Sequence, residues 1–315
     1  MNPRSNTIIN YGLLAGTGLI WGSQFLLIKL SLESFSPASI ASLRVLIGAL
    51  TLSLILVFGF EKVDTTQPAV SFWRSLPDFI LIGFLEGTLP LLLVAWAQLY
   101  LDGSVTAVLI GTVPLFTTLL EFLFVRESRI SARKVIGVSI GFLGIVVLVG
   151  PAILTGFTSR ASGGVSLLLP ALAALTAALC FASALLLIRI RLGSRFGPIR
   201  SAQGILWGSA LTIFPVALWF AKPWQHLDFH PSLRAVLALL ALGIFCGGLV
   251  YTLFVVLINR AGPAFASMSN YLVPLIGAFL GIFISGEKPA STLIAALCLI
   301  LVSLWLSSDR ETQSS

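Results

Sequence analysis

Charged residues are scarce in this chain of 315 residues. Asp, Glu, Lys and Arg together make up 10% of it and hydrophobic residues make up 57%, whereas soluble domains average about 25% charged residues. One soluble core could not bury so much apolar surface, but a bilayer provides an apolar solvent. The composition therefore excludes an ordinary soluble domain and predicts an integral membrane protein, with the lipid bilayer as a partner.

Cysteine and histidine are also rare. Cys180, Cys246 and Cys298 fall in apolar stretches without CxxC spacing, so we expect neither a disulfide framework nor a zinc site. The only histidines, His226 and His230, lie in one short polar segment with nothing further at ligand spacing except an aspartate. Walker-type, GxSxG and HExxH patterns are absent, although ATPases, hydrolases and metalloproteases need them. We therefore expect no enzyme activity, no metal and no cofactor.

What the sequence has instead is long apolar runs, most of them free of charge over the length of a membrane crossing. A transmembrane helix needs about 20 apolar residues, whereas the strands of a membrane barrel alternate over about ten. The runs therefore predict an all-α integral membrane protein with ten transmembrane helices. The expected crossings are 8–32, 37–60, 77–101, 104–126, 131–150, 165–191, 199–221, 234–260, 264–286 and 290–307.

The second half of the chain repeats the first at a constant offset, called here the repeat offset. Val113-Pro114-Leu115 falls on Val273-Pro274-Leu275, and Glu127 falls on Glu287. An internal repeat of this kind predicts two structural units, which we place at 8–150 and 165–308. Since each unit holds five crossings, the second must enter the membrane upside down, so the sequence predicts two inverted five-helix repeats, a transporter signature.

Basic residues are unevenly distributed between the two sides of the membrane that this topology predicts. Thirteen of the 19 Lys and Arg residues fall on the side of the N-terminus and at most six on the other. The stretch 126–134 is basic, whereas its repeat counterpart 286–291 is nearly neutral. Because cytoplasmic loops are enriched in Lys and Arg, we expect both termini in the cytoplasm and residues 151–164 and 286–290 outside. The same bias explains the pI near 9.8, so we do not expect nucleic acid as a partner.

Prolines inside three of the predicted crossings are expected to break helices and to line a cavity. They are Pro90, Pro114 and Pro274. A proline frees helix carbonyls that must then be met by side chains, water or substrate. The alternative is a kink that packs against small neighbouring residues.

Four residues are predicted to bind a small-molecule substrate, namely Trp21, Gln24, Asn270 and Tyr271. Trp21 and Gln24 share a helix face, and an indole beside an amide suits a ligand with apolar and polar parts. Asn270 and Tyr271 precede Pro274 in the crossing at 264–286, which is expected to meet the first crossing at the midplane. Trp21 could instead be buried in the bundle.

Two charged residues deep inside the crossings are proton or gating candidates. Arg44 lies about seven residues inside the crossing at 37–60, roughly 10 Å along the helix. A charge there costs roughly 3 kcal/mol unless it is paired or hydrated, and its expected partners are Glu86, helix carbonyls or a substrate carboxylate. Glu86 lies near the bilayer centre, so it must be paired, with Arg44 as the first candidate, or protonated. A protonated Glu86 that holds helices together is the alternative to a functional role, and its repeat equivalent is Cys246.

Glu121 is the third proton or gating candidate. It lies close to the cytoplasmic end of the crossing at 104–126, where it could reach Arg126 or Arg129. We therefore favour a structural ion pair for it over proton release. Its repeat equivalent is Gly281.

The crossing at 131–150 carries a GxxxG spacing at Gly137 and Gly141, followed by Gly144. Such spacings allow close approach of a second helix. The stretch could form a homodimer face, or it could pack within the bundle.

Several short motifs in the chain occur at characteristic places. They are Trp21-Gly-Ser-Gln-Phe25 with Lys29, Arg44 in a Ser-Leu-Arg-Val-Leu run, Pro114 leading to Arg126-Glu127, and Pro274 leading to Gly286-Glu287. In these elements the chain resembles the EamA type of the drug/metabolite transporter superfamily over nearly its whole length. The resemblance implies ten helices, two EamA repeats, a central cavity between the halves and, in many members, export of amino acids or related metabolites. The second half departs from the pattern, with Phe181-Ala-Ser-Ala184 in place of Trp21-Gly-Ser-Gln24, which argues against a symmetric pair of tryptophan contacts.

We predict a secondary transporter or facilitator in a bacterial inner membrane. It moves small polar metabolites, with amino acids or related compounds and export favoured, by alternating access around a central cavity. The alternatives are an efflux carrier for drugs or toxic compounds and a non-transporting membrane scaffold. An intramembrane enzyme would need a nucleophile and a base, and a channel would need a filter-like loop. Neither is visible in the sequence.

Overall fold

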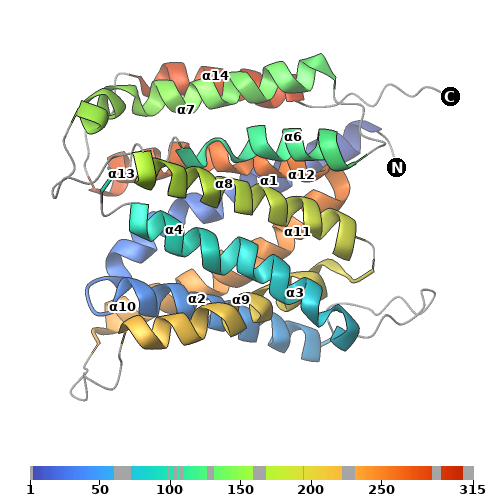
Figure 1. The fold of residues 1–315 in the computed structure, drawn as a ribbon, viewed down its shortest axis with the longest axis vertical. Helices are drawn as coiled ribbons and strands as arrows, with labels where there is room; N and C mark the ends of the chain where they lie inside the picture. Colours follow the sequence, from blue (N-terminus) through green and yellow to red (C-terminus); the bar gives the residue numbers. More distant parts are fainter. Residues whose placement is uncertain are drawn as a thin grey trace.

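The computed structural model describes residues 3–59, 72–97, 100, 101, 106, 109–125, 131–158, 168–193, 195–221, 231–285 and 292–307. These residues form helices joined by turns, and no strand occurs among them. Figure 1 shows the helices stacked alongside one another as a bundle. The expected all-α fold is thus confirmed for the described part of the chain.

The helices divide between the two halves of the sequence. The first half contains α1 (Pro3–Ser31), α2 (Pro37–Val57), η1 (Phe72–Ser75), α3 (Leu76–Gly83), η2 (Phe84–Thr88), α4 (Leu89–Ala97), α6 (Val113–Phe124) and α7 (Ala132–Thr158). The second contains α8 (Leu168–Leu187), η3 (Ile188–Leu192), α9 (Pro198–Ala221), α10 (Leu233–Ala241), η5 (Leu242–Leu249), α11 (Val250–Ala261), α12 (Pro263–Ser267), α13 (Ser269–Ser285) and α14 (Leu293–Ser307). The segments α3, η2 and α4 are continuous, as are α10, η5 and α11, so each set forms one long helix.

Six helices in the described part of the chain are long and apolar enough to cross a membrane. They are Thr7–Ile28, Ala38–Val57, Trp73–Ala97, Leu168–Leu192, Pro198–Trp219 and Leu233–Ala261. Two apolar helices are shorter, Val113–Phe124 and Ile294–Leu306. Large apolar side chains such as Val57, Leu233 and Ile294 are exposed. Helices of this length with exposed apolar side chains support an integral membrane protein, because lipid and not water then covers them.

The helices differ from the predicted crossings at three places. α7 continues through Pro151 and ends at Thr158, beyond the predicted end, because a membrane helix tolerates a proline whose freed carbonyl is satisfied locally. A turn at Thr112 precedes α6, so the crossing predicted at 104–126 is not one continuous helix. The crossing predicted at 264–286 divides at Met268 into α12 and α13, not at the proline that was expected to break it.

Helices that are equivalent under the repeat offset make equivalent contacts. α1 packs against α13, and its counterpart α8 packs against α6. α2 packs against η5, and its counterpart α9 packs against η2, the counterpart of η5. α2 and α9 also pack against each other, as do α7 and α14, the pair at the top of Figure 1. Exchanging the two halves therefore preserves the packing pattern.

The two ends of the bundle are built by different residue types. At one end, called here the Ser36 end, Ser36 and Ser232 cap α2 and α10. The hydroxyl of each accepts a hydrogen bond of 3.2 Å from the backbone N–H three residues later, as N-capping serines do. At the other end, called the Gly262 end, Gly262 has a φ of 84° between α11 and α12, a conformation that glycine adopts without strain. α1 begins and α14 ends at the Gly262 end, on the right of Figure 1.

Two π-helical segments, η2 and η5, occupy equivalent positions in the two halves. Glycines let neighbouring backbones approach them closely. A Cβ atom added to Gly247 of η5 would lie 2.5 Å from the carbonyl oxygen of Arg44, and one added to Gly83, just before η2, would lie 2.6 Å from the carbonyl carbon of Gly208. Close helix contact therefore accompanies both π segments.

Gly141 of the GxxxG spacing and the following Gly144 pack against other helices of the chain. A Cβ atom added to Gly141 would overlap the ring of Tyr271, and one added to Gly144 would lie 3.0 Å from Ile300 of α14. These two glycines therefore serve the packing of α7 on α13 and α14.

Candidate functional site

A cavity of about 290 Å³ lies between helices of both halves. Its polar and aromatic lining consists of Trp21, Gln24, Arg44, Glu86, Thr106, Phe181, Tyr251, Phe254 and Asn270. The structure thus brings together five of the residues singled out from the sequence, which are Trp21, Gln24, Arg44, Glu86 and Asn270. They come from α1, α2, η2 and α13, although they lie far apart in the chain.

Trp21 is held by three contacts with the second half of the chain. Its Nε1–H donates to the carbonyl oxygen of Cys246 over 3.3 Å. Its ring meets the rings of Phe254 and Tyr251 edge to face, with centroids 4.7 and 5.7 Å away, a favourable geometry for aromatic pairs. Because these contacts fix the indole from one side, it can present a rigid surface to the cavity.

Arg44 donates from Nη2 to the same carbonyl oxygen of Cys246, over 3.4 Å. That carbonyl belongs to the π segment η5, where the wider turn disturbs the regular pattern of helix hydrogen bonds. π segments of this kind often mark functional sites. Of the partners expected for Arg44, the structure shows a helix carbonyl. A guanidinium carries five N–H groups, and this long hydrogen bond is the one that Arg44 makes with the described residues. Donors of Arg44 therefore remain for a ligand in the cavity.

Glu86 lies in η2, where 5% of the residue is exposed. Its Oε2 atom has no hydrogen-bond partner within the described residues, and among them no ion pair joins it to Arg44. The pairing with Arg44 that the sequence led us to expect first is therefore not formed in this structure. Glu86 and Arg44 instead line the same cavity as separate groups.

Asn270 and Gln24 supply amide groups to the cavity. The Nδ2 of Asn270 donates to the carbonyl oxygen of Ser267 over 2.9 Å, a group that lies at the break between α12 and α13. This hydrogen bond orients the Asn270 side chain and leaves its Oδ1 atom as an acceptor. The helix break and the amide beside it thus form one local unit.

Tyr271 was expected at the substrate site, but the structure places it elsewhere. It is fully buried, and its hydroxyl donates to the carbonyl oxygen of Val138 in α7 over 2.8 Å. Its neighbour Asn270 faces the cavity, and adjacent residues on a helix point in directions about 100° apart. Tyr271 therefore packs between α13 and α7.

Pro90 and Pro114, two of the three prolines that were expected to line a cavity, are not among its described lining residues. Pro90 is buried in α4 directly after η2, and Pro114 is buried in the first turn of α6. The surroundings of the Pro274 side chain lie outside the described residues, although the residue itself is within α13. Gly111, three residues before Pro114, and Val273, directly before Pro274, line the cavity.

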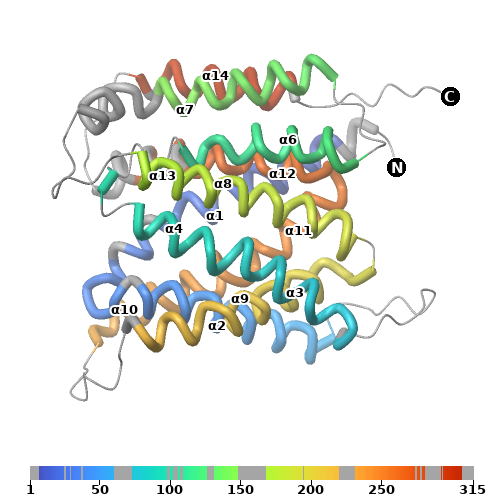
Figure 2. The backbone as a smooth tube through the Cα atoms, viewed as in Figure 1, coloured from blue at the N-terminus to red at the C-terminus, as the bar shows by residue number. Residues whose placement is uncertain are grey.

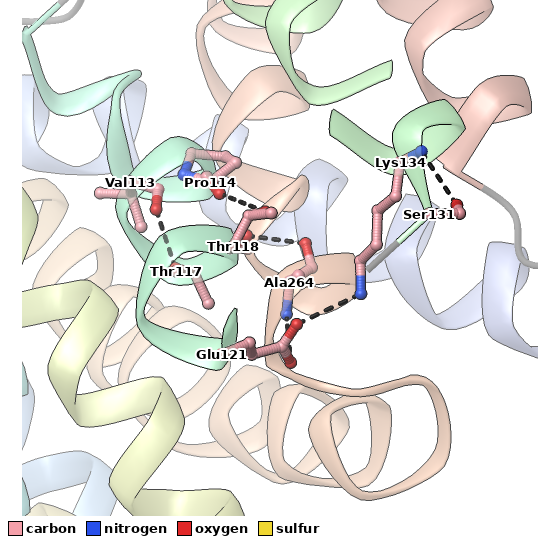
Figure 3. A network of polar contacts seen from close by, with 9 residues as sticks. Val113, Pro114, Thr117, Thr118, Glu121, Ser131, Lys134 and Ala264 are labelled. Carbon is pink, nitrogen blue, oxygen red and sulfur yellow. Dashed lines mark hydrogen bonds and ion pairs between the residues drawn. The ribbon is translucent and has the colours of Figure 1, made fainter. Parts of the chain in front are cut away.

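Glu121 lies at the Gly262 end of α6 and is not part of the cavity. Its Oε2 atom is 3.2 Å from Nζ of Lys134, and its Oε1 atom accepts a hydrogen bond of 3.2 Å from the backbone N–H of Ala264. Figure 3 shows the carboxylate between these two groups. Arg126 and Arg129, its expected partners, lie outside the described residues. The structure therefore shows an ion pair with Lys134.

Sequence reasoning missed several contributors to the cavity, among them Phe181 and Phe254, and also the carbonyl oxygen of Cys246 that holds Trp21 and Arg44. Phe181 is the repeat equivalent of Trp21, so the repeat offset could have found it. Phe254 carries no polar signal. The carbonyl oxygen of Cys246 is a backbone atom, which no residue type could reveal. No cluster of His, Cys, Asp or Glu that could hold a metal ion occurs in the described part of the chain, and His226 and His230 lie outside it.

The profile of the EamA-like transporter family matches this chain twice, at residues 9–150 and 168–309. An uncharacterized transporter of Archaeoglobus fulgidus is 24% identical over 294 residues, which cover 93% of this chain and 96% of that protein. The uncharacterized inner membrane transporter YedA of Escherichia coli K12 is 26% identical over 304 residues, or 94% of this chain and 89% of YedA. A solved crystal structure superposes with a TM-score of 0.70 at 20% identity and covers 97% of this chain and 96% of its own, a likeness of fold.

Proposed function

Because this chain belongs to the EamA-like transporter family and is a membrane transporter, we propose that it carries a small polar metabolite such as an amino acid through the cavity between its halves. Arg44 and Glu86 line the same cavity, and no ion pair joins them. This observation carries the proposal. The transport mode is alternating access by a secondary carrier or facilitator, with export as the net direction.

The chemistry of the cavity supports a substrate that carries both charges. A guanidinium binds a carboxylate through two parallel hydrogen bonds, so Arg44 is suited to a carboxylate. Glu86 is suited to an ammonium group. Trp21 and Tyr251 would contact an apolar side chain between or beside these groups. The volume of about 290 Å³ is at the lower limit of ligand pockets, roughly 300–1,000 Å³, which favours a small metabolite over a bulky drug.

The packing supports ten crossings in two inverted repeats. Equivalent helices exchange contacts between the halves. In Figure 2, α7 begins at the end of the bundle where the C-terminus lies, whereas its counterpart α14 ends there. Equivalent helices thus run in opposite directions, as inverted repeats require.

The distribution of basic residues supports a cytoplasmic location for the Gly262 end. Arg74, Arg133, Lys134, Arg191 and Arg260 all lie at helix ends on that side. Cytoplasmic segments are enriched in such residues, so both termini would face the cytoplasm. YedA carries the name of an inner membrane transporter, and we propose the bacterial inner membrane for this chain as well.

Counterflow in liposomes tests the proposed function. Purified protein is loaded with one unlabelled amino acid at a time and exposed to a trace of the same labelled compound. A matched amine without a carboxylate, a matched carboxylate without an amine and an apolar cationic drug serve as analogues. We expect label accumulation for at least one amino acid, and accumulation at least about tenfold lower for its two singly charged analogues, since a buried charge is then left unpaired.

Arg44→Gln and Arg234→Gln form a matched pair of variants for this test. Arg44 lines the cavity, whereas Arg234 is 70% exposed at the Ser36 end. We expect counterflow to fall in the first variant alone, with both proteins monodisperse in detergent. Transport of the drug but of no amino acid, or equal loss in both variants, would contradict the proposal.

A further inference from the structure

The two ends of the bundle hold different polar contacts between the halves. Two ion pairs lie at similar, though not identical, places in the two halves. Each joins the end of the first crossing of one half to the start of the third crossing of the other. Arg191 pairs with Asp78 over 3.5 Å at the Gly262 end, and Arg234 pairs with Glu33 over 3.8 Å at the Ser36 end. Both pairs are partly exposed, so each contributes little, and together they favour neither end.

The contacts of Glu121 have no such counterpart. Glu121 and Lys134 are repeat equivalents of Gly281 and Ile294, which carry neither charge. Their side chains are 7% and 13% exposed, so the ion pair is far better shielded from water than the other two. A shielded, charge-assisted contact is stronger than an exposed one. It therefore adds stability at the Gly262 end through a contact that has no repeat equivalent at the Ser36 end.

Glu121 also joins the two halves. Its Oε1 atom accepts from the N–H of Ala264 in the first turn of α12, in the second half, whereas Glu121 lies in the last turn of α6, in the first half. Lys134 belongs to the same half as Glu121. If the halves separated at this end, the hydrogen bond to Ala264 would break, but Lys134 could stay beside the carboxylate. The contact can therefore open without leaving a buried charge unpaired, a situation that is otherwise strongly unfavourable.

The cavity lies toward the opposite end. Val94, one of its lining residues, is three positions before the end of α4 at the Ser36 end. At the Gly262 end, the lining residue Phe254 is seven positions before the end of α11. More helix residues thus separate the cavity from the Gly262 end, where Glu121 lies, than from the Ser36 end.

From these observations we propose that Glu121 is a latch that joins the two halves and closes the Gly262 end of the cavity. Lys134 holds the carboxylate in place for this contact. The latch biases the carrier toward the state that is open at the Ser36 end. The proposal rests on the alternating access of the proposed function. A carrier with symmetric repeats would have no intrinsic preference between its two states. A contact between the halves that has no counterpart in the other repeat supplies such a preference.

The test measures access to each end without measuring transport. The three native cysteines are replaced by alanine, which keeps the Cys246 carbonyl in place. Thr118→Cys reports on the Gly262 end, because Thr118 is buried in α6 one turn before Glu121. Val94→Cys reports on the Ser36 end. Reaction with an impermeant thiol reagent is followed from each side of sealed vesicles, with and without Glu121→Ala.

With Glu121→Ala we expect labelling at Thr118→Cys from the Gly262 side to rise roughly tenfold, because one charge-assisted hydrogen bond is lost. Labelling at Val94→Cys from the other side should fall. Glu121→Gln, whose amide oxygen can still accept from Ala264, should give a smaller change in the same directions. Asp78→Asn, which removes the ion pair with Arg191 at the same end, should change neither rate.

Unchanged rates in folded Glu121→Ala, or rates that rise at both reporters, would overturn the latch, since the second result means a loosened fold. If Glu121→Ala does not fold, the graded response of Glu121→Gln against Asp78→Asn decides in the same way. Failure of the proposed function is separate, because it would appear as absent counterflow in the protein with native Glu121.

Discussion

At the scale of single residues, the carbonyl oxygen of Cys246 organises the polar side of the cavity. It accepts hydrogen bonds from both Trp21 and Arg44, while the thiol of Cys246 donates to the carbonyl oxygen of Ile20 over 3.3 Å. One position in η5 thus fixes two side chains of the other half. Its repeat equivalent, Glu86, presents a carboxylate to the same cavity from η2. Equivalent backbone sites in the two halves therefore carry different chemistry, one through a main-chain oxygen and one through a side chain.

Removing the indole of Trp21 tests its role as a substrate contact. We expect Trp21→Ala to weaken substrate binding about tenfold, because the loss of an aromatic surface costs on the order of 1.5 kcal/mol, and to lower the folded yield less. Affinity from counterflow competition and yield from gel filtration are the two measurements. Tyr271→Phe is the control, since it removes only a hydrogen bond to Val138 and should lower thermal stability without changing affinity. A Trp21→Ala protein with reduced yield and unchanged affinity would assign Trp21 to the core.

Removing the ionisable group of Glu86 tests its role in transport. Glu86→Gln keeps the shape and the hydrogen-bonding capacity of the side chain, so we expect a folded protein. Since glutamine cannot bind or release a proton, the rate of transport or its dependence on pH should change. Counterflow is measured between about pH 5 and about pH 8, where a perturbed carboxylate can titrate. Transport equal to that of the original protein over this whole range, at normal yield, would show that ionisation of Glu86 is irrelevant.

At the scale of elements, the helices interrupt their own regularity beside the cavity. The π segments η2 and η5 and the break at Met268 each lie next to lining residues. The sequence placed the breaks at prolines, and this was wrong for the ninth crossing. A proline removes one donor, but neighbouring residues decide where the helix yields. Glycines at both π segments remove the side chains that would otherwise keep helices apart.

A methyl group at Gly247 tests whether close packing holds η5 against α2. We expect Gly247→Ala to lower stability by about 1–3 kcal/mol, as overpacking does, because the added Cβ would lie 2.5 Å from the carbonyl oxygen of Arg44. The matched control is Gly12→Ala in α1, where a Cβ meets nothing within 4 Å. There, alanine should be neutral or stabilising. Thermal unfolding in detergent measures both, and equal midpoints for the two variants would contradict the packing at Gly247.

At the scale of the whole molecule, helices of the two halves lie side by side in the stacked layers of Figure 1. The pair α7 and α14 lies at one side of the bundle, and the pair α2 and α9 lies toward the other. Each pair consists of repeat equivalents that contact each other, so the boundary between the halves passes through the cavity and not beside it. Motion of one half against the other would therefore change access to the cavity directly.

Cysteine accessibility tests the orientation of the whole bundle. Ser131→Cys reports on the Gly262 end, and Leu32→Cys reports on the Ser36 end, where the residue is exposed. In cells without the native cysteines, we expect an impermeant thiol reagent to label only Leu32→Cys from outside, because the basic end of the bundle should face the cytoplasm. Permeabilised cells provide the control in which both react. Labelling of Ser131→Cys in intact cells would reverse the topology.

Composition and periodicity alone determined that this is a helical membrane protein with a repeated unit. Apolar length and the repeat offset are properties of the chain itself, and they do not depend on which helices touch. The likeness of the motifs in the two halves was likewise visible without coordinates. The pairing of Arg44 with Glu86, and the placement of Tyr271, Pro90 and Pro114 in the cavity, could not be predicted in this way. Each depends on the rotation of one helix against another.

Only the tertiary structure decided which atoms meet. It turned Asn270 toward the cavity and Tyr271 toward α7, although the two are adjacent. It also brought Ala264 within hydrogen-bonding distance of Glu121 across 143 residues of chain, and the carbonyl oxygen of Cys246 within reach of Arg44. Backbone N–H and C=O groups are the same at every position of a sequence. Their part in a site therefore appears only when helix breaks and helix packing have exposed them.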